Sequence, residues 1–204
     1  MLYARTDAGL NRRPAYDADA IGVWNLLGHS IRNDVLTDAY AWVIAAYCNP
    51  FSSPFVPALA LDHAAFVELL ARRFPYFVPP QRWLAAQQGE VGKGVALDEF
   101  PDLLRLLLDH RAVCDEHHRC VAHLVAAACM GTDHLWQDLG LPDRMALSSL
   151  LCWHFPTLAE KNTGDMKWKK FFYKQLCERE GINVCKSPSC ADCCDYGRCF
   201  GPED

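Results

Sequence analysis

The chain has 204 residues and a formal net charge of -5, and 51% of its residues are hydrophobic. That length and composition suffice for one domain with a sizeable core. No run reaches the roughly eighteen uncharged apolar residues that a membrane helix needs, because the run from Val35 to Tyr47 is short and contains Asp38. Nucleic-acid binding is disfavoured because the chain is acidic and its basic residues gather in one short segment. We therefore expect a soluble protein that binds neither membrane nor nucleic acid.

Three segments of the chain differ in composition. Residues 1–15 are polar and aperiodic, so we predict that they are poorly ordered. Residues 16–181 repeat apolar side chains at mostly helical spacing, and strand-like alternation persists nowhere, which predicts a single all-α domain. Residues 182–204 form a cysteine-rich tail, which we predict to be a metal-binding loop.

The first predicted helices precede a proline-rich loop. Apolar spacing predicts core helices at residues 21–27 and 35–47, and the prolines within residues 49–57 predict that a loop follows. Asp62 stands where the N-cap of a third helix belongs, and the prolines from Pro75 onwards end that helix.

The next predicted helix begins near Pro101 and has two possible ends. It either breaks near Arg111 or continues towards Cys129. Both readings keep the all-α prediction, but they place the histidines and cysteines that follow residue 109 very differently.

If that helix is continuous, His110, Cys114 and His117 lie at positions i, i+4 and i+7 on one face. Imidazole and thiolate groups at this spacing can converge on one ion, which would make a second metal site. In the alternative, these three side chains pack against neighbouring elements, and His118 and His123 are solvated.

The last predicted helix links the domain to the tail. Asp165 is its expected N-cap, and Gly181 stands where a left-handed C-terminal cap belongs. Its apolar stripe consists of Trp168, Phe171, Phe172 and Leu176.

The opposite face of that helix is basic. Between residues 161 and 186 there are seven basic residues and three acidic ones. We call Lys167, Lys170 and Lys174 the lysine face. This concentration of positive charge predicts that the lysine face docks an acidic partner or captures an oxyanion. The alternative is an ordinary solvated helix face. Cys177 lies at the edge of this face, where it is a fifth ligand, a transfer thiol or a free, partly buried cysteine.

Four cysteines of the tail follow the pattern C-x4-C-x2-C-x5-C, namely Cys185, Cys190, Cys193 and Cys199. The chain has eleven cysteines, an odd number, and its first residues lack an apolar signal segment, so we expect a reducing, cytoplasmic location and few disulfides. All four thiols lie within one short, turn-rich loop, which favours a compact iron-sulfur cluster over a structural zinc site.

Two blocks of the sequence carry a family resemblance. The segment from Met166 to Glu203 and the segment HLWQDLGLPDR, from His134 to Arg144, resemble the NifQ family of nitrogen-fixation proteins. The resemblance implies a non-enzymatic carrier of a molybdenum-iron-sulfur cluster that supplies molybdenum for the iron-molybdenum cofactor of nitrogenase. It also implies that the partners are the cofactor-assembly scaffold complex and the nitrogenase iron protein. Molybdate or another molybdenum source is the further expected partner.

The family's four-cysteine motif maps onto Cys185, Cys190, Cys193 and Cys199, and Cys194 is an additional thiol outside it. His134 lies in the other block, ahead of a helix that Pro142 is expected to open. It is a secondary candidate for a nitrogen ligand or proton donor near the cluster, with a bond to a backbone carbonyl as the alternative.

Two other kinds of protein remain possible on the residues alone. One is a zinc-stabilised interaction module without cargo, because four thiolates also suit zinc. The other is a thiol redox enzyme that uses Cys193 and Cys194, although the strand-to-helix setting of thioredoxin-like sites is missing.

Overall fold

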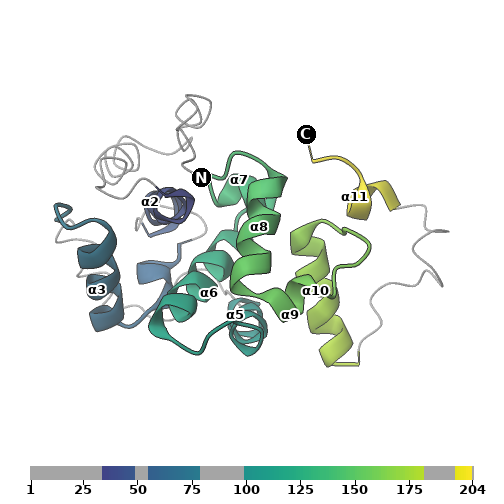
Figure 1. The fold of residues 1–204 in the computed structure, drawn as a ribbon, viewed down its shortest axis with the longest axis horizontal. Coiled ribbons are helices and arrows are strands. Elements are labelled where there is room, and N and C mark those ends of the chain that lie inside the picture. The colour runs from purple at the N-terminus through teal and green to yellow at the C-terminus, as the bar shows by residue number, and fades with distance from the viewer. Residues whose placement is uncertain (1–33, 49–54, 79–98, 182–195, 204) are drawn as a thin grey trace.

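The computed structural model describes residues 34–48, 55–78, 99–181 and 196–203, and every regular element in these ranges is a helix (Figure 1). The all-α prediction is confirmed for them. The predictions for residues 1–15, for a helix at residues 21–27 and for the tail cysteines before residue 196 lie outside the described residues.

The elements, in chain order, are α2 (Val35–Tyr47), the 3-10 helix η1 (Pro57–Ala60), α3 (His63–Arg73), α5 (Phe100–Asp109), α6 (Glu116–Cys129), α7 (Leu135–Asp138), α8 (Arg144–His154), α9 (Pro156–Ala159), α10 (Trp168–Arg179) and α11 (Tyr196–Phe200). None of these helices is both long and apolar enough to cross a membrane.

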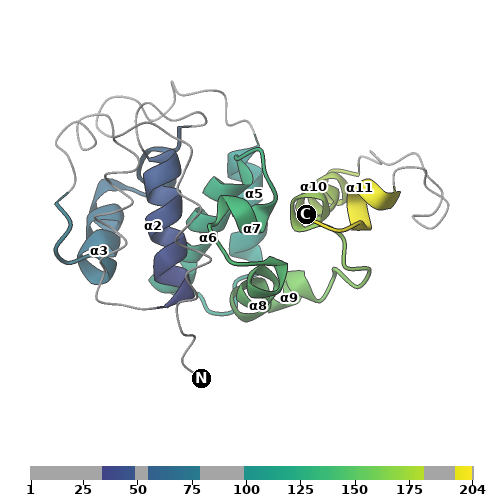
Figure 2. The ribbon, with the colours of Figure 1, turned by 90° about the horizontal axis from the view of Figure 1, so that it is seen from above.

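Helix α6 is the centre of the fold. It contacts α2, α5, α7 and η1, and Figure 2 shows it between α2 and α5. Each residue from Val121 to Cys129 is at most 5% exposed. Most of them are alanine or another small residue, which lets the neighbouring helices approach closely. This mostly apolar C-terminal part of α6 therefore lies in the interior, whereas its first turn is polar and partly exposed.

Aspartate N-caps begin four of the helices. The side chains of Asp34, Asp62, Asp115 and Asp143 each accept a hydrogen bond from a backbone N–H three residues later, at 2.8–2.9 Å. Each cap contributes about 1 kcal/mol because it satisfies an N–H that the helix cannot. The prediction for Asp62 is confirmed.

Two predicted helix starts were wrong. Helix α10 begins at Trp168 with Lys167 at its N-cap, whereas Asp165 has a φ of 53° and pairs with Arg144. Helix α8 begins at Arg144, because Asp143 caps it, so Pro142 lies before the helix and not in its first turn. Gly181 has a φ of 67°, as a left-handed C-terminal cap requires.

A buried polar network joins α2, α7 and α10. Tyr47 donates to Asp138 Oδ1 at 2.7 Å, Lys169 pairs with the other oxygen of Asp138, and Lys169 Nζ also donates to the Gly131 carbonyl at 2.8 Å. Burial raises the pKa of Asp138, and Lys169 and Tyr47 oppose that rise. Gly131 leaves room for the network, because a Cβ there would lie 2.3 Å from the Tyr47 hydroxyl.

Candidate metal centre

Helix α11 carries Cys199, and it lies beside α10 in both views of the fold (Figures 1 and 2). The Lys167 N–H donates to the Cys199 carbonyl at 2.7 Å. The Phe200 ring lies against Gly164, where an added Cβ would be 3.3 Å from it, and it stacks on Tyr196 with ring centres 4.6 Å apart. Cys199 is therefore held, half-buried, at the N-terminal end of α10.

A second contact holds the end of the described tail. The Glu203 side chain is 4% exposed, and its oxygens lie 3.7 Å from Arg144 Nη1 and 3.9 Å from His134 Nδ1. Arg144 also donates to the carbonyls of Asp165, at 2.7 Å, and Met166, at 3.1 Å. The two blocks that carry the family resemblance thus meet in space, although more than twenty residues separate them in sequence.

His134 lies at this meeting point. Its ring faces Glu203, and its backbone N–H donates to Gln137 Oε1 at 3.1 Å, at the start of α7. The structure therefore places His134 beside the tail, while a role as metal ligand stays a prediction.

The lysine face lies beside the same segment. Lys170 and Lys174 are exposed on α10, and Lys174 Nζ is 3.7 Å from Glu178. Lys174, Lys161 and Phe200 line a cavity of about 540 Å³. Lys169, which its sequence position did not distinguish from the other lysines, lies on the same helix but points into the buried network.

Cys185, Cys190, Cys193 and Cys194 lie outside the described residues, so the structure places only Cys199 of the predicted ligands. The structure describes seven cysteines, and each of them is free. Burial raises the pKa of Cys48 and of Cys129 to about 12, so both remain thiols at neutral pH. Cys177 is half-buried on α10.

The intrahelical site at His110, Cys114 and His117 was wrong. Helix α5 ends at Asp109 and α6 begins at Glu116, so the three residues share no helix face. His110 Nδ1 bonds to the Thr157 hydroxyl at 2.7 Å. The Cys114 sulfur accepts from Arg111 at 2.5 Å.

His118 and His123 are buried, at 8% and 5% exposure, and were wrongly expected to be solvated in the alternative interpretation. His123 Nδ1 bonds to the Leu59 carbonyl at 2.9 Å. His117 and His118 instead contact His154, which comes from the C-terminal end of α8. Within the described ranges, no group of three or more His, Cys, Asp or Glu side chains is arranged to hold an ion as it stands.

In its described part, the chain is an all-helical protein whose cysteine-bearing C-terminal segment is seated on its last long helix. The sequence pattern of the NifQ family matches residues 39–201. A protein named NifQ from Azotobacter vinelandii is 44% identical over 163 residues, which are 76% of this chain and 80% of that protein. The chain belongs to the NifQ family of nitrogen-fixation proteins.

Other relatives agree with this assignment. A NifQ homolog from Sinorhizobium fredii is 41% identical over 71% of this chain and 61% of its own length. NifQ from Rhodobacter capsulatus is 43% identical over 48% of this chain and 54% of its own length. No solved structure matches the chain.

Proposed function

We propose that the chain carries a molybdenum-iron-sulfur cluster and supplies its molybdenum for the biosynthesis of the nitrogenase iron-molybdenum cofactor. The observation that carries this proposal is the cysteine motif. Cys185, Cys190, Cys193 and Cys199 all lie within residues 39–201, the range that matches the NifQ family. The chain is then a carrier and not an enzyme, and the cluster is its cargo.

The chemistry of the motif suits that cargo. Thiolates bind iron in iron-sulfur clusters, and molybdenum in a reduced state also prefers sulfur ligands, so a cuboidal cluster can hold molybdenum at one corner. Thiolates around a cluster add negative charge, and the basic residues beside Cys199 offset it. These are Lys167, which bonds to Cys199 through its backbone, Lys174, which lines a cavity with Phe200, and Arg144, which lies near Glu203.

A carrier must also release its cargo. The described tail is held by a small number of contacts, chiefly the Lys167 N–H, the Phe200 ring and the Glu203 carboxylate, and Cys199 is only half-buried. A ligand of the acceptor protein can therefore reach this cysteine without unfolding the core. The expected acceptors are the cofactor-assembly scaffold complex and the nitrogenase iron protein, and molybdate or another molybdenum compound is the source.

The metal content of protein purified without oxygen tests the proposal. It predicts brown protein with iron and acid-labile sulfide in comparable amounts, and with molybdenum after growth on molybdate. The matched control is the Cys199→Ala variant, which should carry less of all three. Colourless protein with one zinc per chain would instead establish the alternative, a zinc-stabilised interaction module without cargo.

A further inference from the structure

The side chains of three histidines from two helices contact one another. His117 and His118 lie in the first turn of α6, and His154 is the last residue of α8. Their ring centres are 5.1, 5.2 and 5.3 Å apart, so each ring contacts both of the others. We call these residues the histidine cluster.

The cluster contains a buried nitrogen that lacks a partner. His154 is 7% exposed, and its Nδ1 atom is fully buried without a hydrogen bond. Leaving such a group unsatisfied costs about 1–3 kcal/mol, so it calls for an explanation. Burial lowers the pKa of His154 to about 4 and also lowers the pKa of His117. Both rings are neutral at pH 7 and have a lone pair to give.

His118 has the arrangement that metal-binding histidines usually have. Its Nδ1 atom lies 2.7 Å from the Asp115 carboxylate, and Asp115 also caps α6. A carboxylate that accepts the Nδ1 proton fixes the tautomer and leaves Nε2 as the ligand atom. Packing of three aromatic rings alone would not need a carboxylate bonded to one ring or a buried ring nitrogen without a partner.

The spacing of the rings also fits one ion. With a metal–nitrogen bond of about 2.0–2.1 Å, each ring centre lies about 3.2 Å from the ion, so two rings at the tetrahedral angle have centres about 5.2 Å apart. All three observed separations are within 0.1 Å of that value. The ring nitrogens do not converge as the side chains stand. Rotation about χ2 moves the nitrogens while leaving each ring centre nearly in place, and this rotation has broad, shallow preferences.

From this geometry we propose that His117, His118 and His154 form a site for one divalent late first-row metal ion such as Zn²⁺, separate from the cysteine motif. Three imidazole ligands suit Zn²⁺, Co²⁺ and Ni²⁺ better than Mg²⁺ or Ca²⁺. Helix α8 separates the site from the tail by about 15 Å, because Arg144 and His154 stand at its two ends.

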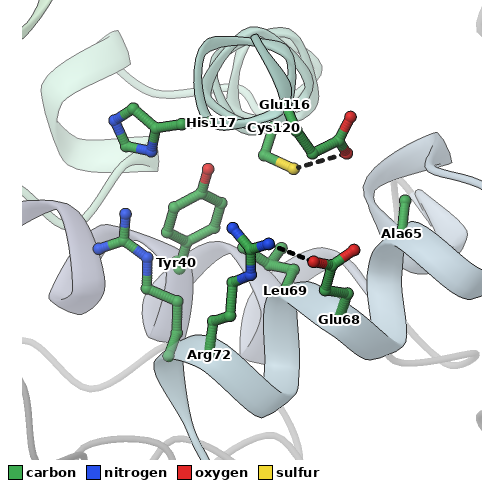
Figure 3. Close-up of a pocket in the computed structure, with 9 residues that line it drawn as sticks. Tyr40, Ala65, Glu68, Leu69, Arg72, Glu116, His117 and Cys120 are labelled. Atoms are coloured by element: carbon green, nitrogen blue, oxygen red, sulfur yellow. Dashed lines mark hydrogen bonds and ion pairs between the residues drawn. The ribbon is translucent and has the colours of Figure 1, made fainter.

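A cavity gives an ion access to one member of the histidine cluster. His117 lines a cavity of about 160 Å³ between α2, α3 and α6, where it stands over the Tyr40 ring (Figure 3). Arg73 opposes a cation there, but it pairs with Asp34 at 3.3 Å, and Asp115 adds a further negative charge. Arg73 nevertheless acts on His117 and His154 more strongly than either carboxylate does, so an ion binds there against part of its positive charge.

Cobalt binding tests the site, because Co²⁺ reports its ligands in the visible spectrum. The full-length chain with Cys185, Cys190, Cys193 and Cys199 replaced by Ala lacks the four motif thiolates, and alkylated wild-type protein is a parallel sample. We expect one Co²⁺ per chain with the absorption of tetrahedral nitrogen ligation and without thiolate charge transfer. Binding should weaken on acidification, because the rings must be neutral.

Variants on this background assign the ligands. His117→Ala alters an exposed residue, so folding should persist while affinity falls more than about 100-fold. Asp115→Asn keeps the helix cap but weakens the support of His118, so affinity should fall about 10- to 100-fold. His63→Ala, an exposed histidine on α3, is the matched control and should change nothing.

Failure of both samples to bind Co²⁺ would overturn the proposal, and so would binding that His117→Ala leaves intact. His154→Gln provides a second check, since it retains a buried polar group and its folding can be followed by circular dichroism. Thiolate charge transfer in the spectrum would assign the ion to one of the remaining cysteines and would equally refute a three-histidine site.

Discussion

Lys169 offers a test of the packing that joins α10 to the core. Its side chain is 17% exposed and pairs with the Asp138 carboxylate, which is 6% exposed. Lys169→Met removes the positive charge, while the Tyr47 hydroxyl continues to donate to the buried carboxylate. Removing one member of a buried pair costs about 3–5 kcal/mol. We expect the lower end, about 3 kcal/mol, because Tyr47 still donates.

Urea unfolding measures this change. With a urea dependence of about 2–3 kcal/mol per molar, a loss of 3 kcal/mol moves the midpoint down by about 1 M. Lys170→Met is the matched control, because it makes the same substitution one position along, on an exposed lysine, and should cost less than about 0.5 kcal/mol. Adding Asp138→Asn to Lys169→Met removes the orphaned charge and should recover most of the loss.

The pH dependence follows from the pKa of Asp138, which burial raises. A carboxyl whose folded pKa lies above its unfolded value destabilises the protein at pH values above the folded pKa, and that cost disappears as the carboxyl protonates. Without Lys169 the folded pKa rises further, so the gap between the variant and wild type should narrow from pH 7 towards pH 5. Equal midpoints for Lys169→Met and Lys170→Met at pH 7, or a gap independent of pH, would refute the reasoning.

Three further predictions concern the tail and its surroundings. Replacing any one motif cysteine by Ala should lower the iron and sulfide bound per chain, while the helical circular dichroism stays unchanged. Cys194→Ala should have a milder effect. If Cys194→Ala lowers the iron content more than Cys193→Ala does, Cys194 is the ligand. Replacing the three lysines of the lysine face by Glu should slow delivery of molybdenum to an acidic partner and abolish the salt dependence of that rate. An unchanged rate at low salt would show that the lysine face is an ordinary solvated surface. Glu203→Gln should increase amide hydrogen exchange in residues 196–203 but not in α6, and unchanged exchange there would argue against the Glu203 anchor.

The sequence predicted those features that local chemistry determines. Asp62 as a cap and Gly181 as a terminator follow from the hydrogen bonds and backbone angles that their residue types favour. The apolar stripe of α10 predicted that helix, whereas the break between α5 and α6 was left open. The prediction of Asp165 as the N-cap of α10 was wrong, because its contact with Arg144 holds it in a turn before the helix begins.

The arrangement of side chains between helices could not be predicted from spacing. His154 is 36 residues beyond His118 and joins the histidine cluster only because α8 packs beside the start of α6. Lys169 and Lys170 are adjacent lysines, and only the position of Asp138 on α7 decides which of them is buried. The Glu203 contact likewise depends on the end of the described tail lying near the first residue of α8. The motif cysteines were named from their spacing and from the family resemblance, and their role as ligands stays a prediction.

The most direct test of the carrier function is delivery of molybdenum. Protein loaded during growth on molybdate is purified without oxygen and added as the sole molybdenum source to a cofactor-synthesis reaction containing the scaffold complex, the nitrogenase iron protein and cofactor-deficient nitrogenase. The account predicts that nitrogenase activity appears in proportion to the loaded protein added, and that Cys199→Ala protein prepared in the same way supports much less. Activity that appears only when free molybdate is also supplied would contradict it.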